Sequence, residues 1–318
     1  MRIILFFVFV LLTSCGGGGG SSSNNPAPEV NLSASKTDLL VPGNTTIQWS
    51  SNNSTSCLAT GEEFSVDQIA EIRKSWTDYG VAIFPDQKLT HENFEKFSLL
   101  FGNFGDDPYL KSLDDRPNIV EVKRAANEKA PPFGGNWHSD WSFQKTPPCA
   151  TLLHSKIVPP QGGDTLFANT QLAYEDLDQE TKDKIENLEV IHSAGLPYAD
   201  DGFYATEKET RSMNIITSKE AKKEQIHPLV KTHPETQKKG LFINPVYTSR
   251  ILDVPDEESF LLLSTLYEHM TQEKYVFRHK WSENMLLMWD NRTVMHMAEG
   301  GYDGYDRLLH RITIANAS

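Results

Sequence analysis

The stretch NWHSDWSF, residues 136–143, places His138 and Asp140 two residues apart among aromatic side chains. In an extended strand, side chains two residues apart point to the same face, so we expect both to approach one point. An imidazole and a carboxylate are two of the three protein ligands in a 2-His-1-carboxylate iron(II) site. On its own the spacing also fits ordinary polar residues on a solvated strand, so its meaning depends on residues far downstream.

A third ligand is available near the C-terminus. The stretch MLLMWDNRTVMHMAEG, residues 285–300, carries His296 after a turn, although a lone histidine is more often a packing or surface residue. Arg307 and Arg311 follow, four residues apart, so both face one side of an extended strand. Two buried cations on one face are costly without an anion, and the planar guanidinium suits a carboxylate. The pattern therefore indicates an anion-binding strand near the histidine.

Several segments of the chain resemble the taurine dioxygenase-like (TauD/TfdA) family of Fe(II)- and 2-oxoglutarate-dependent dioxygenases. The segments are NWHSDWSF, PPQGGDTLFANTQLAYEDL, HPLVKTHPETQKKGLFIN and MWDNRTVMHMA followed by RLLHRITI. They occur in the family's order, and the resemblance runs from about residue 64 to residue 315. It implies a double-stranded β-helix and an enzyme that uses O2 and 2-oxoglutarate to hydroxylate a small organic substrate, with release of succinate and CO2.

The resemblance also implies roles for individual residues. His138, Asp140 and His296 would ligate Fe(II), and Thr165 and Arg307 would hold the distal carboxylate of 2-oxoglutarate. Asp140 favours hydroxylation, because related halogenases lack this carboxylate and place a halide on the metal. Two alternatives stay open: a catalytically inactive binding module on the same fold, and a different cupin-type metal hydrolase or isomerase.

Substrate contacts implied by the resemblance fall on Arg311, Asn136 and Asp107. Arg311 stands where sulfonate-using members bind the substrate anion. Asp107 replaces a histidine that helps to bind the sulfonate, and Gly134 stands where a polar substrate contact is expected. These departures argue against taurine and favour a cationic or hydroxylated small organic molecule.

The pattern of apolar residues predicts an α+β fold. Helices are expected in SVDQIAEIRKSWTDYG before Gly80, in LTHENFEKFSLLFG with Thr90 as its N-cap, and in the stretches 173–188 and 256–272. Short strand-like runs, from VAIFP and WHSDWSF to RLLHRITIA, separate them. Many short strands with helices at the start and in insertions indicate a jelly-roll, cupin-like double-sheet core with flanking helices over residues 62–318.

The first sixty residues differ in composition from the rest of the chain. Residues 1–15 contain an early Arg2, a short apolar run and the ending LTSC, which resembles the lipobox of a bacterial lipoprotein with Cys15 as the lipidated residue. Residues 16–28 form a Gly/Ser-rich linker. Residues 29–61 form a short β-rich segment that resembles part of an immunoglobulin-like module, with a β-prone linker as the alternative.

These features predict a lipoprotein of the bacterial periplasm or outer membrane, attached to the membrane only through a lipid on Cys15. The alternative is a cytoplasmic protein whose N-terminus is a fusion or a start-site artefact, because 2-oxoglutarate and ferrous iron are plentiful in the cytoplasm. The formal net charge of −13 argues against a nucleic-acid partner. We expect a small-molecule partner, and the sequence leaves a homo-oligomer open.

Overall fold

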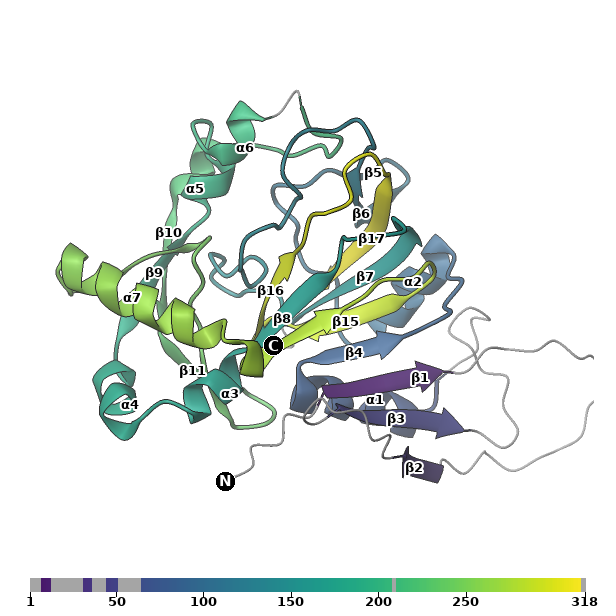
Figure 1. The fold of residues 1–318 in the computed structure, drawn as a ribbon, viewed down its shortest axis with the longest axis horizontal. Helices are drawn as coiled ribbons and strands as arrows, with labels where there is room; N and C mark the ends of the chain where they lie inside the picture. Colours follow the sequence, from purple (N-terminus) through teal and green to yellow (C-terminus); the bar gives the residue numbers. More distant parts are fainter. Residues whose placement is uncertain (1–6, 13–30, 36–43, 51–63, 208–209, 316–318) are drawn as a thin grey trace, which may run out of the picture.

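The computed structural model describes residues 7–12, 31–35, 44–50, 64–207 and 210–315. The chain has an α+β fold with two facing β-sheets at its centre (Figure 1). The larger sheet has the strand order β4-β15-β7-β17-β6-β5. The bounds of these strands are Val81–Phe84 (β4), Leu286–Asp290 (β15), Ala150–Ile157 (β7), Arg307–Ile314 (β17), Arg116–Arg124 (β6) and Ser112–Leu113 (β5).

The smaller sheet is antiparallel and has the order β14-β8-β16. Its strands are Val276–His279 (β14), Thr165–Asn169 (β8) and Val294–Ala298 (β16). Trp289 and Leu309 of the larger sheet pack in one apolar cluster with Phe167 and Val294 of the smaller sheet. The two sheets therefore bury a shared core, which confirms the predicted double-sheet arrangement.

Two helices cover the other face of the larger sheet. Leu286 and Met288 of β15 pack in a cluster with helices α1 (Val66–Tyr79) and α2 (His91–Leu99). Trp289, next along the strand, packs in the core between the sheets. This alternation is the period-2 pattern of a strand that is buried on both faces.

The ends of these two helices follow the predicted cap residues. Ser65 accepts a hydrogen bond from the Gln68 amide, and the Gln68 side chain accepts one from the Ser65 amide in return. Gly80 ends α1 with φ of 83°, a left-handed conformation that glycine adopts without a steric cost. Thr90 caps α2 by accepting a hydrogen bond from the Asn93 amide.

A further group of elements lies beside the smaller sheet, with helix α7 along its outer edge (Figure 1). Two small sheets have the orders β10-β9-β13 and β11-β12. The strands are Glu189–Ser193 (β9), Glu224–Pro228 (β10), Val230–Thr232 (β11), Lys239–Leu241 (β12) and Thr248–Ile251 (β13). The helices are Gly195–Tyr198 (α5), Phe203–Thr206 (α6) and Asp256–Met270 (α7), with short 3-10 turns at Lys219–Lys222 (η2) and Glu273–Tyr275 (η3).

One helix expectation needs correction. The stretch 173–188 is not a single helix: α3 spans Thr170–Glu175 and α4 spans Gln179–Ile185. The break arises because Asp178 adopts an extended conformation and accepts a hydrogen bond from the Thr181 amide, which starts a second helix. The sequence pattern could not separate the two, because apolar residues continue at helical spacing across the break.

The N-terminal segments contribute a three-stranded sheet with the order β1-β3-β2, in which Phe7–Leu12 (β1) runs parallel to Asn44–Ser50 (β3). Strand β2, Asn31–Ser35, pairs antiparallel with β3. Cys15, the linker and the rest of the 29–61 segment lie outside the described residues, so the signal, the lipid anchor and the immunoglobulin-like module stay predictions. Among the helices of the described part of the chain, none is long and apolar enough to cross a membrane.

Candidate active site

Three potential metal ligands from distant parts of the chain meet between the two sheets. The Nε2 atoms of His138 and His296 lie 3.7 and 3.9 Å from Oδ1 of Asp140. One ligand atom from each residue lies within 4.8 Å of the others, and all three residues are buried. Two imidazoles and one carboxylate at this spacing suit a single divalent ion. The structure therefore brings together the three residues that the sequence predicted as ligands.

The local structure around His138 differs from the expected strand. His138 and His296 form an isolated antiparallel bridge in which each amide donates to the other's carbonyl, at 3.0 and 2.7 Å. After His138 the chain turns, and Trp141 adopts a φ of 48°. The expectation that WHSDWSF forms a strand is thus wrong, although its side chains meet as predicted. The turn forms because Trp141 is buried in the inter-sheet core, which draws the backbone out of an extended path.

A hydrogen bond to the ring of His138 fixes how this residue presents its two nitrogens. His138 Nδ1 lies 2.7 Å from the carbonyl oxygen of Asn136, so Nδ1 carries the proton and Nε2 faces Asp140 with a free lone pair. Burial lowers the pKa of His138 and lowers that of His296 well below its usual range. Both rings are therefore held in the neutral form that binds metals.

Asp140 is held by a hydrogen-bonded network that the sequence did not reveal. Its Oδ1 accepts from Arg311 Nη1 at 2.9 Å, and its Oδ2 accepts from Thr151 Oγ1 at 2.6 Å. Asn291 Nδ2 donates to the same Thr151 oxygen at 2.9 Å, while Trp289 Nε1 donates to Asn291 at 2.9 Å. Burial raises the pKa of Asp140, but the charge of Arg311 and the hydrogen bond from Thr151 outweigh this effect, so the pKa lies well below its usual range. The network keeps the carboxylate ionised and fixed in direction.

Replacing Thr151 with valine is expected to weaken metal binding by about 10- to 100-fold. The valine keeps the side-chain shape but leaves Oδ2 of Asp140 without its donor and Asn291 without its acceptor. Anaerobic calorimetric titration with Fe(II) measures the change. Thr170→Val is the matched control, because Thr170 is also buried and its hydroxyl donates only to a backbone carbonyl, that of Thr293. Equal affinities in the two variants would show that Thr151 does not tune the site.

Arg311 is buried and pairs with two carboxylates. Its Nη1 contacts Asp140, and its Nε donates to Asp107 Oδ1 at 3.2 Å. Asp107 also accepts from Trp141 Nε1 at 2.7 Å and from Thr313 Oγ1 at 3.2 Å. Burial raises the pKa of Asp107, and the Arg311 charge opposes that shift. The structure thus joins Arg311 and Asp107 to each other, and their contact with a substrate stays a prediction.

Arg307 lies on the same face of β17 as Arg311 but has different surroundings. Its guanidinium is buried, and Nη2 donates to the Gly163 carbonyl at 3.1 Å. Among the described residues, no carboxylate forms an ion pair with it. Burial therefore lowers the pKa of Arg307. A buried guanidinium without a counter-charge is a ready site for an anion.

Thr165 begins β8, two residues after Gly163, and its hydroxyl accepts a hydrogen bond from Trp281 Nε1 at 3.0 Å. The Thr165 proton is therefore free to be donated to an anion. His279 pairs with Thr165 across the sheet, and burial together with the charge of Arg307 lowers its pKa to about 3. Sequence reasoning found Thr165 and Arg307 but missed Trp281 and His279, which lie in a segment without a distinguishing motif.

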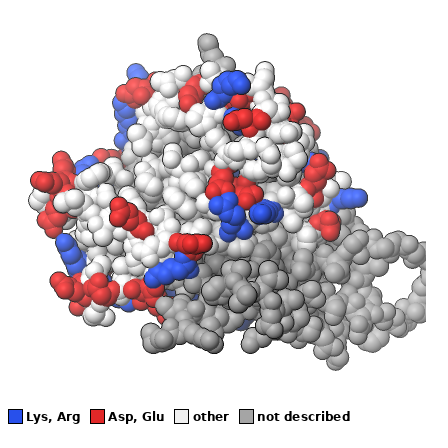
Figure 2. Space-filling model, viewed as in Figure 1, with Lys and Arg blue, Asp and Glu red and all other residues white. Residues whose placement is uncertain are grey.

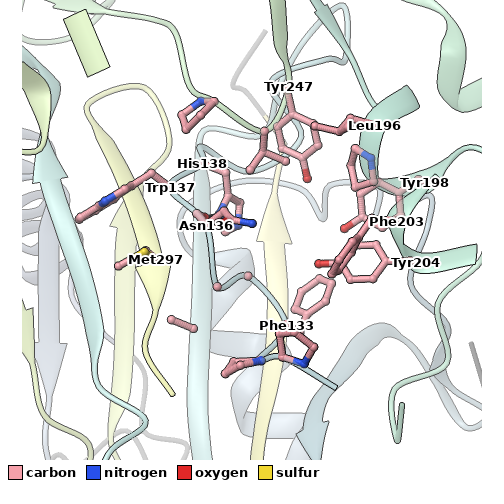
Figure 3. A pocket seen from close by; sticks show the side chains of 18 of the residues that line it. Phe133, Asn136, Trp137, His138, Leu196, Tyr198, Phe203, Tyr204, Tyr247 and Met297 are labelled. Atoms are coloured by element: carbon pink, nitrogen blue, oxygen red, sulfur yellow. The ribbon is translucent and has the colours of Figure 1, made fainter. Parts of the chain in front are cut away.

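A cavity of about 870 Å³ has one of the three potential metal ligands, His138, in its wall. Figure 3 shows the rings of Tyr198, Phe203 and Tyr204 on one side and His138 with Asn136 on the other. This volume falls in the range of pockets that hold small organic ligands. Asn136 lines this cavity, and its contact with a substrate stays a prediction. The aromatic wall was not foreseen.

Residues 55–313 match the family model described as "Taurine catabolism dioxygenase TauD, TfdA family". The chain belongs to the TauD/TfdA family. The match covers both β-sheets of the core and all three potential metal ligands. It confirms the resemblance drawn from the ordered motifs of the sequence.

Individual TauD/TfdA-family relatives differ in the substrates that their names record. The chain is 33% identical, over 77% of its length, to a Schizosaccharomyces pombe protein provisionally assigned as an alpha-ketoglutarate-dependent sulfonate dioxygenase, and spans 62% of that protein. It is 33% identical to an alkylsulfatase of Acinetobacter baylyi, over 72% of this chain and 70% of the relative. A crystal structure of a taurine dioxygenase from Burkholderia xenovorans superposes with a TM-score of 0.69 and 26% identity, covering 91% of this chain and 92% of that one.

Proposed function

We propose that this TauD/TfdA-family protein is an Fe(II)- and 2-oxoglutarate-dependent dioxygenase that hydroxylates a small organic molecule and releases succinate and CO2. The observation that carries the proposal is the buried triad of His138, Asp140 and His296 beside the buried and uncompensated Arg307. The first provides a metal site and the second an anion site. The name of the S. pombe relative includes alpha-ketoglutarate, which is 2-oxoglutarate, and this supports the same co-substrate here.

The triad fits Fe(II) on the chemistry of its donors. Two neutral imidazoles and one ionised carboxylate form the donor set typical of non-haem Fe(II) oxygenases. When bound, iron together with 2-oxoglutarate supplies the chemistry that uses O2 to oxidise a C–H bond. Asn136 holds the His138 ring through its carbonyl, and Thr151 with Arg311 holds the Asp140 carboxylate. The protein thus fixes the direction of its ligand atoms.

The anion site fits the distal carboxylate of 2-oxoglutarate. Arg307 offers a planar fork of N–H donors, and Thr165 offers a hydroxyl proton because its oxygen already accepts from Trp281. The burial of these groups excludes water and strengthens each charge-assisted bond. The aromatic cavity, whose wall includes His138, would then receive the organic substrate.

Anaerobic titration of the full-length protein with Fe(II) and then 2-oxoglutarate tests the proposal. We expect a weak visible charge-transfer band that requires both components, followed by succinate formation when air is admitted. Zn(II) in place of Fe(II) is the control and should give neither signal. A folded sample that shows no band and forms no succinate would overturn the proposal and favour an inactive binding module. Turnover that consumes no 2-oxoglutarate would instead indicate a metal hydrolase or isomerase.

A further inference from the structure

We infer that the substrate of this site is an uncharged molecule with an aromatic or similarly flat apolar body, in contrast to the sulfonate and alkylsulfate groups in the relatives' names. The inference rests on the proposed function and narrows its substrate class. It follows from two separate features of the structure: the composition of the cavity wall, and the partners of the arginine behind the metal ligands.

The wall of the cavity is built from aromatic side chains that contact one another. The ring of Tyr204 lies 5.6 Å from that of Phe133, at an interplanar angle of 30°. It also lies 5.2 Å from Tyr198 and 5.3 Å from Phe203. Figure 3 shows these rings gathered around the space in front of His138. Such a surface binds flat apolar groups by dispersion and by offset or edge-to-face ring contacts.

The described residues that line the cavity include no lysine or arginine. Their one carboxylate, Glu299, pairs with Arg278, whose Nη2 donates to it at 2.9 Å. Arg211 lies close behind the wall, 4.9 Å from the ring of Tyr204, but its Nε donates to Glu207 at 2.8 Å. In the view of Figure 2, the surface between helix α6 and strand β16 is drawn mainly white, with charged side chains at its margins. Among the described residues, the wall of the cavity therefore offers an anion no unpaired cation.

The resemblance implies that Arg311 meets a substrate anion, yet the charge of Arg311 is already balanced. Two carboxylates, those of Asp140 and Asp107, bond to this one guanidinium. The exposed fraction of the side chain is 4% for Arg311, 3% for Asp140 and 10% for Asp107. Arg311 Nη2 is buried without a hydrogen-bond partner among the described residues, so the two N–H groups of that nitrogen are left to donate. Donors on a guanidinium whose charge two carboxylates already balance suit a hydroxyl or carbonyl oxygen.

The cost of burying charge decides between the two kinds of substrate. An anionic head group that left water to sit beside Arg311 would meet a cation that already faces two carboxylates, so its desolvation would not be repaid. An uncharged head group loses little by the same transfer if one hydrogen bond is made. We therefore expect the ion pair between Asp107 and Arg311 to weaken the binding of anionic substrates.

Probes that share a shape and differ in charge test this inference. We would titrate phenoxyacetamide against phenoxyacetate, and 2-naphthalenesulfonamide against 2-naphthalenesulfonate, into the full-length protein by anaerobic calorimetry. Each titration is made with and without Fe(II) and 2-oxoglutarate. We expect each uncharged probe to bind at least tenfold more tightly than its anion. Equal or tighter binding of the anions, or no binding by either uncharged probe, would overturn the inference.

Asp107→Asn tests the cause of the selectivity. The asparagine keeps an oxygen for Trp141 and Thr313 but removes one negative charge from Arg311, so we expect the preference for uncharged probes to fall at least tenfold. Asp106→Asn, at the exposed neighbouring position, is the matched control and should keep the wild-type ratio. An unchanged ratio in folded Asp107→Asn would contradict the assigned cause. If that variant does not fold, the wild-type probe pairs still decide. If the protein preferred the uncharged probes but gave no charge-transfer band with Fe(II) and 2-oxoglutarate, the dioxygenase proposal would be rejected and the substrate inference would stand.

Discussion

Replacing His296 with alanine should abolish iron binding and 2-oxoglutarate turnover in a protein that stays folded. The substitution removes one of three ligand atoms, and the loss of metal affinity should exceed the roughly 100-fold that is typical of outer-shell changes. The ring packs 4.6 Å from Trp289, so its removal also opens space in the core. By analogy with other large-to-small core substitutions this costs about 2–4 kcal/mol, which a domain of ordinary stability tolerates.

The chain offers a closely matched control for that experiment. His310 is buried to a similar extent, and its Nδ1, like that of His296, has no hydrogen-bond partner among the described residues. It lies on β17 between Leu309 and Arg311 and faces the opposite side of the sheet, where its ring packs against His91. His310→Ala should therefore lose a similar amount of packing and keep its iron.

Iron content after anaerobic loading and gel filtration, together with urea denaturation, distinguishes the two variants. We expect His296→Ala to retain no iron and His310→Ala to retain a full equivalent, with comparable free energies of unfolding for the metal-free proteins. Retention of iron by His296→Ala within tenfold of the wild-type affinity would mean that His296 is not a ligand. Loss of iron from both variants would point to a general packing defect.

The three residues of the metal triad could be predicted because they stand in ordered motifs. The local structure that brings them together could not be predicted. The alternation argument for His138 and Asp140 assumed a strand, and the structure has a bridge followed by a turn at Trp141. The contact arises because His138 bridges to His296 and the buried Trp141 redirects the chain. Local spacing therefore identified the right residues through the wrong local structure.

The electrostatics of the site depend on contacts that local patterns do not contain. Asp107 and Arg311 are 204 residues apart, so no spacing could indicate that they pair. Without that pairing, Asp107 reads as an added negative charge in the substrate pocket, and the sequence alone favoured a cationic or hydroxylated molecule. With it, the same residue is an ion-pair partner that balances the charge of Arg311. The roles of Thr151 and Asn291 could not be predicted for the same reason, because they depend on the pairing of the distant strands β7 and β15.

Replacing Arg307 with methionine should have opposite effects on 2-oxoglutarate binding and on stability. Methionine has a similar length and no charge. It removes the donors proposed for the distal carboxylate, and loss of one partner of a buried charged pair costs about 2–5 kcal/mol. The affinity for 2-oxoglutarate should therefore fall by roughly 30-fold or more.

The metal-free protein should gain stability from the same change. Without 2-oxoglutarate, Arg307 is a buried cation that no carboxylate among the described residues balances, and burial lowers its pKa, so the folded state disfavours its charge. Exchange of a buried charged group for an apolar one of similar volume is neutral or stabilises by about 1–4 kcal/mol. Urea denaturation of the metal-free variant measures the free energy of unfolding. Calorimetry with Fe(II) and 2-oxoglutarate measures the affinity for 2-oxoglutarate.

Arg124 provides the control, because it lies directly opposite Arg307 in the register of β6 and β17 and is equally buried. It is bonded to Asp303 at 2.7 Å and to the carbonyl of Glu128 at 3.2 Å, so its charge is already satisfied. Arg124→Met should thus lower the stability and leave the affinity for 2-oxoglutarate unchanged. If Arg307→Met lowered stability to the same degree and kept its 2-oxoglutarate affinity, Arg307 would be a structural residue, and the anion site would have to lie elsewhere. The opposite signs are expected because Arg307, a buried cation without a carboxylate partner among the described residues, has its charge balanced only when the anionic ligand is bound.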